Sequence, residues 1–174
     1  MRSFMAEHQR VVVKPLDLMG GRSVFVADVN DGNRNVILET VSHSGTRYTM
    51  LQKYLAEIKT AGDKRIILID GRPIPHALVR IPDEGDHRGN MDAGAITEVQ
   101  PLTDRDLWIC DQVAPALVEK GLMFTGIDVI GDYLTELNVT SPTGIRELER
   151  SGDLQVTRQL FDAIEARLPE SGSR

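Results

Sequence analysis

Short apolar runs separated by turn residues dominate the first half of the chain. Val11-Val12-Val13 is a β-branched run of the kind that favours a strand. Gly20-Gly21 separates this run from the next apolar one, which indicates a hairpin with a glycine-rich tip. The pattern predicts a short helix at 2–9 and strands at 11–13, 23–27, 35–40, 47–55, 65–70 and 74–81.

The pattern changes at Pro82. Residues 82–101 carry scattered glycines and prolines without periodicity, which predicts a long loop that is either functional or disordered. Thr103 fits the N-cap of a helix that ends at Gly121. The expected apolar face of this helix comprises Leu107, Cys110, Val113, Ala114, Leu117 and Val118. Beyond it we expect strands at 123–130 and 133–139, a helix that begins at Ser141-Pro142, and a final helix at about 154–167.

Strands with two or three interposed helices, and no regular strand–helix alternation, indicate an α+β fold rather than a doubly wound parallel sheet. We expect Cys110 to be a buried structural thiol, because it lies on the apolar helix face. The aromatic residues expected in the core are Phe25, Trp108, Phe124 and Phe161.

Composition excludes a disordered chain, since 41% of the 174 residues are hydrophobic. No apolar run reaches the roughly 20 residues that span a bilayer, and no secretory signal is recognisable, so we expect no membrane partner. A lone cysteine fits a reducing compartment, and we expect a cytoplasmic protein. With 20 Lys and Arg against 26 Asp and Glu, the net charge of −6 argues against a nucleic-acid partner.

Asp128, Glu136 and Asn138 form the cluster that carries most chemical information. All three are hard oxygen ligands of the kind that Mg²⁺ prefers, and the last two share one face of the predicted strand. A plain two-residue turn at Gly131-Asp132 pairs Asp128 with Thr135, on the wrong face for this site. A bulge or a three-residue loop places it opposite Glu136 instead. The alternative is a solvated hairpin with ordinary surface acids, and spacing alone favours that alternative.

Three further groups of residues are candidates for binding anions. Lys14 precedes Gly20-Gly21, and a lysine beside a glycine-rich loop suits phosphate, although a plain hairpin turn explains the glycines equally. Arginines can converge on a carboxylate or phosphate, or they can face solvent beside acidic neighbours. A helix N-terminus can bind a carboxylate, or it can simply be capped. The arginines are Arg65, Arg80 and Arg88, and the helix start is Ser141-Pro142-Thr143.

Taken together, these segments closely resemble the bacterial-type glutathione synthetase family of ATP-grasp ligases. The resemblance runs from about Val11 to Leu168 and is most specific over 128–147. The segments that carry it are Lys14-Pro15-Leu16-Asp17 with Gly20-Gly21, Gly45-Thr46-Arg47-Tyr48, Gln52-Lys53-Tyr54-Leu55, Gly62-Asp63-Lys64-Arg65, Arg80-Ile81-Pro82, Arg88-Gly89-Asn90, and Asp128 to Glu147.

This resemblance implies an ATP-grasp fold, a mostly antiparallel sheet with flanking helices. It implies a partial first subdomain at 1–58, incomplete at its N-terminus, and a second subdomain at 59–174. The N-terminal substrate domain of the family has no counterpart in the sequence. The implied reaction joins γ-glutamylcysteine to glycine through an acyl phosphate and converts ATP to ADP and phosphate. The implied cofactors are ATP and Mg²⁺, with Mn²⁺ as a substitute.

The resemblance also implies a role for each candidate residue. Asp128, Glu136 and Asn138 would bind the metal, and residues 82–101 would form a lid. The implied nucleotide-binding residues are Lys14, Gly20, Gly21, Gln52, Lys53, Tyr54, Leu55 and Asp63. The implied catalytic residues are Arg65, Arg80 and Arg88, and the implied substrate-binding residues are Asn90, Ser141, Pro142 and Thr143. The lid reads Gly94-Ala95-Ile96 where the family carries Gly-Gly-Arg.

Three interpretations follow from the resemblance. The chain is a ligase part that works as a homo-oligomer or with a complementing N-terminal chain. Alternatively, it is a truncated, catalytically inactive fragment that at most binds nucleotide, or a different ATP-grasp ligase. Because a strand and a second nucleotide-binding lysine of the family are missing, we expect little glutathione-forming activity from the chain alone.

Overall fold

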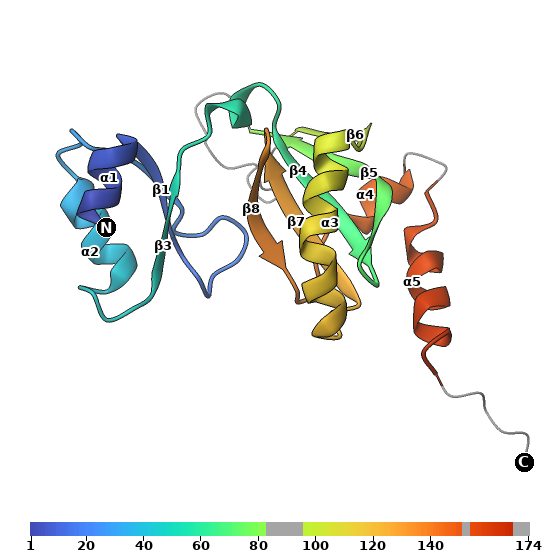
Figure 1. The fold of residues 1–174 in the computed structure, drawn as a ribbon. Helices are drawn as coiled ribbons and strands as arrows, with labels where there is room; N and C mark the ends of the chain where they lie inside the picture. The colour runs from blue at the N-terminus through green and yellow to red at the C-terminus, as the bar shows by residue number, and fades with distance from the viewer. Residues whose placement is uncertain (83–95, 151–153, 169–174) are drawn as a thin grey trace, which may run out of the picture. The chain divides into compact units, whose positions relative to one another are not determined.

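The computed structural model describes residues 1–82, 96–150 and 154–168 (Figure 1). Its contacts divide the chain into two units. One is Met1–Gly62 with the described ends of Ile81–Ile96, and the other is Asp63–Arg80 with Thr97–Arg174. No helix in the described ranges is both long and apolar enough to cross a membrane.

The first unit is a three-stranded antiparallel sheet covered on one face by two helices (Figure 1). Strand β1 alternates buried and half-buried residues, and Val11 and Val13 point at the helices while Val12 and Lys14 point away. The sheet order is β2-β1-β3. The elements are α1 (Arg2–His8), β1 (Arg10–Pro15), β2 (Phe25–Asp28), α2 (Arg34–Ser42), β3 (Thr49–Lys53) and the 3₁₀ turn η1 (Ala56–Lys59). Val13 pairs with Phe25, which confirms the hairpin around Gly20-Gly21.

The strand predicted at 35–40 is wrong, because these residues lie in helix α2. The β-branched pair Val36-Ile37 suggested a strand, but the buried positions are Leu38 and Val41, which are three residues apart. That spacing is helical, and Val36 stays exposed on the solvent side. The helix ends where His43 adopts a left-handed conformation.

The second unit is a five-stranded sheet in the order β6-β5-β4-β7-β8, with α3 packed on one face (Figure 1). The four strands β5-β4-β7-β8 pair antiparallel. The elements are β4 (Asp63–Ile69), β5 (Arg72–Ile81), β6 (Ile96–Pro101), α3 (Asp104–Glu119), β7 (Phe124–Ile130), β8 (Tyr133–Asn138), α4 (Ile145–Arg150) and α5 (Val156–Glu165). The loop predicted at 82–101 is wrong at its end, because Ile96–Pro101 form strand β6. Residues 83–95 lie outside the described ranges.

Helix α3 begins where predicted and buries much of its expected face. Ile109, Cys110 and Leu117 pack on Ile66 and Ile127 of the sheet. Cys110 is confirmed as a buried thiol. Its burial, followed by the charges of the neighbouring acids, raises the pKa of Cys110 to about 12.

Three aromatic residues expected in the core are instead exposed. Trp108 is 50% exposed on α3, Phe161 is 57% exposed on α5, and Phe25 is 37% exposed on β2. The margins of the expected α3 face are also exposed, at Leu107 and Val118. The helix therefore packs through a narrower stripe than the pattern indicated, because one sheet face covers only one side of it.

A buried ion pair fixes the start of α3 to the sheet. Asp106 is fully buried and accepts hydrogen bonds from the backbone and hydroxyl of Thr103 at 3.0 and 2.7 Å. Both of its oxygens also accept from Lys64 Nζ, at 2.9 and 2.8 Å. One carboxylate thus completes the helix cap and neutralises a lysine of β4.

We expect Asp106→Ala to lower the free energy of unfolding by about 3 kcal/mol, because it removes the cap and leaves Lys64 unpaired. The matched control is Asp104→Ala, which removes an exposed acid of the same helical turn and should change stability by less than about 1 kcal/mol. Urea unfolding followed by circular dichroism measures both. Equal losses for the two variants would contradict this account of the helix start.

Candidate functional site

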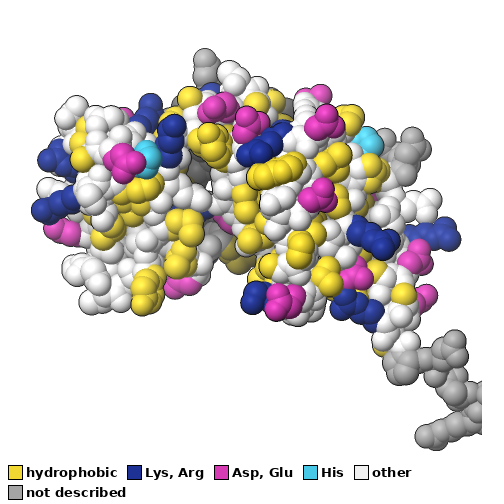
Figure 2. Space-filling model, in the orientation of Figure 1, with side chains coloured by type: hydrophobic (Ala, Val, Ile, Leu, Met, Phe, Trp, Pro, Cys, Tyr) yellow, Lys and Arg dark blue, Asp and Glu magenta, His cyan; other side chains and the backbone are white. Residues whose placement is uncertain are grey.

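Charged side chains gather on the face of the five-stranded sheet that α3 leaves uncovered. Strand pairing places Arg65 opposite Asp128, and Asp128 opposite Glu136. It also places Asp63 opposite Arg80. Because direct cross-strand partners share a face and lie within contact distance, four neighbouring strands contribute to one cluster. Elsewhere, on the molecular face in Figure 2, acidic and basic side chains are interspersed rather than segregated by sign.

A β-bulge sets the register on which this cluster depends. Ile130 pairs with Tyr133 across the Gly131-Asp132 turn, yet Asp128 pairs with Glu136 and not with Thr135. Thr135 is the extra residue, and its hydroxyl donates to the backbone carbonyl of Asp128 at 3.1 Å. The shifted register that a metal site requires is therefore confirmed.

Asp128 is the most heavily contacted member of the cluster. Its Oδ1 accepts from Arg65 Nε at 2.5 Å and lies 3.1 Å from an Arg80 guanidinium nitrogen. Its Oδ2 accepts from a second Arg65 nitrogen at 3.0 Å and from Asn138 Nδ2 at 3.3 Å. Burial alone would raise the pKa of Asp128, but hydrogen bonds and charge from the two arginines outweigh it and hold the pKa below its usual value.

Asp63 is buried beside the same arginines. Its Oδ2 accepts from Arg80 at 2.5 Å, whereas no described residue bonds to its Oδ1 or to Arg80 Nε. Burial, reinforced by the charge of Asp128, raises the pKa of Asp63 to about 7 against the opposing effect of Arg80 and Arg65. Asp63 therefore lies inside the cluster rather than at its surface.

The helix predicted to begin at Ser141-Pro142 starts four residues later, at Ile145. Ser141 adopts a positive φ of 48°, which places it in a turn rather than at a helix cap. The turn points the Thr143 carbonyl at Arg65, whose terminal nitrogen donates to it at 3.1 Å. Ser141 and Thr143 are exposed, and Pro142 is buried.

The chemistry of the donors around Asp128 fits a divalent cation such as Mg²⁺. Asp128 is held ionised, Glu136 faces it across the ladder, and Asn138 follows on the same face. Two carboxylates and one amide are oxygen donors of the kind that Mg²⁺ prefers, and water or phosphate oxygens would complete its coordination. Within the described ranges, no group of three or more His, Cys, Asp or Glu is placed to hold a metal, and the proposed set has only two such residues together with Asn138.

The first unit carries a separate group of candidate residues. Lys14 pairs with Met50 and Val12 with Gln52, so Lys14 and Gln52 share the sheet face turned away from the helices. Gly20 and Gly21, with φ of 67° and 70°, lie in the hairpin loop. The last three candidates of this group, Lys53, Tyr54 and Leu55, run from the end of β3 into the segment after it.

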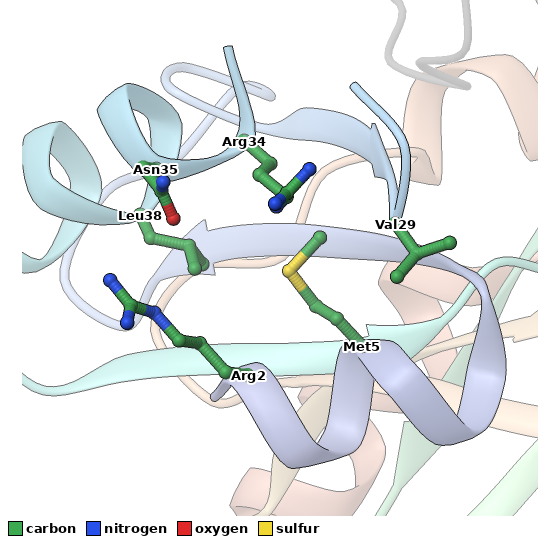
Figure 3. Close-up of a pocket in the computed structure, with 6 residues that line it drawn as sticks. All are labelled: Arg2, Met5, Val29, Arg34, Asn35 and Leu38. Carbon is green, nitrogen blue, oxygen red and sulfur yellow. The ribbon is translucent and has the colours of Figure 1, made fainter. Parts of the chain in front are cut away.

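Other features lie apart from these groups. A hollow of about 260 Å³ in the first unit is lined by Arg2, Arg34, Asn35 and three apolar side chains, and includes no predicted site residue (Figure 3). Arg88 and Asn90 lie outside the described ranges. The sequence interpretation overlooked Gly126 and Gly144, which flank Arg65. The available signal for Gly126 was its place inside a strand, because a glycine there often marks a point where other atoms approach the strand backbone closely.

Comparison with known proteins identifies the family. The model for "Prokaryotic glutathione synthetase, ATP-grasp domain" matches residues 1–153. A glutathione synthetase of Pseudomonas aeruginosa is 53% identical over 168 residues, which are 97% of this chain and 53% of that protein. The chain spans about half the length of the curated relatives it matches.

Solved structures agree on the fold. D-cycloserine synthetase DcsG superposes with a TM-score of 0.69 at 18% identity, over 97% of this chain and 60% of that one. The ATP-grasp ligase PsnB, complexed with a minimal precursor, Mg and ADP, gives a TM-score of 0.62 at 22% identity, over 95% of this chain and 48% of that one. These likenesses confirm the α+β ATP-grasp fold. Together with the family match, they place this chain in the ATP-grasp domain family of prokaryotic glutathione synthetases.

Proposed function

We propose that this chain supplies the metal-binding, nucleotide-binding and dipeptide-binding residues of an ATP-dependent ligase that forms glutathione. The substrates would be γ-glutamylcysteine and glycine. The observation that carries the proposal is the row Arg65–Asp128–Glu136, in which a bulge aligns two carboxylates beside a buried arginine. Family membership supports the reaction, and the chain covers about half the length of the relatives it matches.

Asp128, Glu136 and Asn138 would hold Mg²⁺, as the PsnB complex with Mg and ADP suggests for this fold. The bound ion would neutralise phosphate charge during transfer. Arg65 and Arg80 keep Asp128 ionised and oriented through contacts with its two carboxylate oxygens. Mn²⁺ has the same preference for oxygen ligands and is expected to substitute.

On the acyl-phosphate route, the arginines would stabilise the negative charge that develops on the reacting groups. The cysteinyl carboxylate of the dipeptide would attack the γ-phosphorus of ATP, and the bond from that phosphorus to the bridging oxygen would break to release ADP. The glycine amine would then attack the acyl carbon, form the peptide bond and expel phosphate, with loss of an amine proton. Arg65 already donates three N–H groups to protein acceptors, so its two remaining donors would face the reacting group. Ser141 and Thr143, both exposed beside Arg65, would bind the substrate carboxylate, with the buried Pro142 fixing their turn.

The first unit would supply the remaining nucleotide contacts. Lys14 would reach phosphate oxygens, while Gly20 and Gly21 give the hairpin loop a backbone that can approach them. The segment 52–55 would border the adenine. Arg88 and Asn90, which lie outside the described ranges, stay proposed for catalysis and substrate binding. A second candidate function, nucleotide binding without ligation, is favoured by the half-length match to the relatives.

The metal assignment predicts the effect of Glu136→Gln. Glu136 is exposed, so this change should keep the fold while it removes a charged ligand. We expect the affinity for Mg·ADP to fall by about tenfold or more, with no change in nucleotide binding without metal. Isothermal titration calorimetry measures the first affinity at fixed free Mg²⁺ and the second in the presence of excess EDTA. Asp132→Asn, a neighbouring exposed acid in the β7–β8 turn, is the matched control. Equal affinities for Glu136→Gln and the parent chain would reject the assignment.

The ligase proposal predicts sustained formation of ADP over many turnovers only when both γ-glutamylcysteine and glycine are present. A coupled assay of ADP formation, with glutathione quantified by chromatography, separates it from the second candidate. The chain alone should form little glutathione, and addition of the N-terminal half of a relative should raise the rate by about tenfold or more. Mg·ADP binding without any ligation under either condition would favour the binding-only function.

The environment of Asp63 predicts a pH effect on stability. Its folded pKa of about 7 lies above the unfolded value of 3.8, so the folded state binds the proton more tightly. The resulting stabilisation is complete below pH 3.8 and is lost as the pH rises through 7. Between about pH 6 and 8, the free energy of unfolding of the parent chain should fall by about 1 kcal/mol relative to Asp63→Asn. Urea titrations at both pH values measure the difference, and a constant difference would contradict the raised pKa.

A further inference from the structure

Arg65 reaches Asp128 by crossing strand β7 directly over Gly126. A β-carbon built at residue 126 would lie 3.0 Å from Arg65 Cδ and 3.4 Å from Arg65 Nε. It would lie only 2.8 Å from Pro142 Cβ. Non-bonded carbon atoms prefer separations of about 3.5–4.0 Å, so any side chain here would displace its neighbours. The backbone of Gly126 is not in the left-handed region, so space alone requires glycine.

Gly144 also lies close to the aliphatic part of Arg65. A β-carbon there would lie 3.5 Å from Arg65 Cγ and 3.4 Å from Leu78 Cδ2. Gly144 also has a φ of 117°, which only glycine adopts readily. We define the Arg65 channel as Gly126, Pro142, Gly144 and Leu78: the two glycines lie against the aliphatic part of the arginine, and Pro142 and Leu78 lie against these glycines.

The channel delivers the guanidinium to three acceptors at once. Nε and one terminal nitrogen donate to the two oxygens of Asp128, and the other terminal nitrogen donates to the Thr143 carbonyl. The side chain of Arg65 is only 7% exposed. Such a fork-to-fork contact depends on the direction from which the planar guanidinium arrives, and the channel walls set that direction.

The geometry points to Gly126 as a positioning residue of the site: its missing side chain lets Arg65 lie across β7 and hold the Asp128 carboxylate edge-on. This inference deepens the proposed function and rests on it for the part that Asp128 plays in Mg-nucleotide binding. Gly126 has no side chain that could bind metal or nucleotide, and its proposed effect is transmitted through Arg65.

The central test is Gly126→Ala in the full chain, with Gly32→Ala as the matched control. A β-carbon at Gly32 would have no neighbouring atom within 4 Å, and the φ of Gly32 is not left-handed, so the same change there should be silent. We expect Gly126→Ala to weaken Mg·ADP binding by about tenfold and to raise the Mg²⁺ concentration for half-maximal nucleotide binding. Nucleotide binding without metal should be unchanged. Equal Mg·ADP affinity in both variants would overturn the inference.

Two double variants establish which neighbour transmits the effect. If Gly126 acts through Arg65, Gly126→Ala should change Mg·ADP affinity by less than about twofold when Arg65 is already alanine. If the conflict is instead with the loop, Pro142→Gly should restore binding to Gly126→Ala, and that result would overturn the inference. The second double variant decides the question where Arg65→Ala fails to fold.

Failure of the proposed function can be told apart from failure of this inference. If the parent chain does not bind Mg·ADP, the proposed function fails. Melting temperatures of the parent, the two single variants at Gly126 and Pro142 and their double variant then test the channel alone. Restoration of the melting temperature by Pro142→Gly would overturn the role of Arg65. A loss that persists in the double variant would support it, because the contact with Arg65 Cδ remains.

Discussion

The buried pair of Arg65 and Asp128 is the interaction on which the candidate site depends. Both side chains are 7% exposed, and they sit on the adjacent strands β4 and β7. A charge removed from water needs a partner with good geometry, because an unpaired one destabilises the fold strongly. The strand register, the bulge in β8 and the turn at 141–144 all bear on this contact, since each places an acceptor or a neighbour of Arg65.

The bulge at Thr135 determines which side chains of β8 lie on each face of the sheet. Glu136 and Asn138 pair with Asp128 and Gly126 on the arginine face, while Leu134 and Leu137 pair with Val129 and Ile127 on the face of α3. A strict alternation could not give both arrangements, because it would turn either the acids or the leucines to the wrong side. The extra residue therefore places Glu136 and Asn138 on the arginine face and leaves the exposed Leu134 and Leu137 on the other face.

The sequence predicted the parts of the fold that local chemistry decides. Thr103 with Asp106 marked the start of α3, and Gly20-Gly21 marked a hairpin, because capping and turn residues act on their own neighbours. Helix α2 was mistaken for a strand, since a run such as Val36-Ile37-Leu38 suits either structure until a sheet takes one face. The spacing of Asp128, Glu136 and Asn138 suggested a site, but whether they met depended on a bulge that spacing allows and does not require. The space over Gly126 depends on Arg65 and Pro142, which are distant in sequence.

Charge balance favours a cation at the proposed site. Arg65 and Arg80 are matched by Asp63 and Asp128, so these four residues are electroneutral when both acids are ionised, and Glu136 adds one negative charge. A cluster with that balance does not attract a polyphosphate by itself. The raised pKa of Asp63 relieves part of the excess negative charge near neutral pH, whereas Asp128 stays ionised. The arginines of the second unit therefore mainly neutralise the carboxylates of the same unit. A divalent ion at Asp128 and Glu136 is what would reverse the sign of the site and allow phosphate to approach.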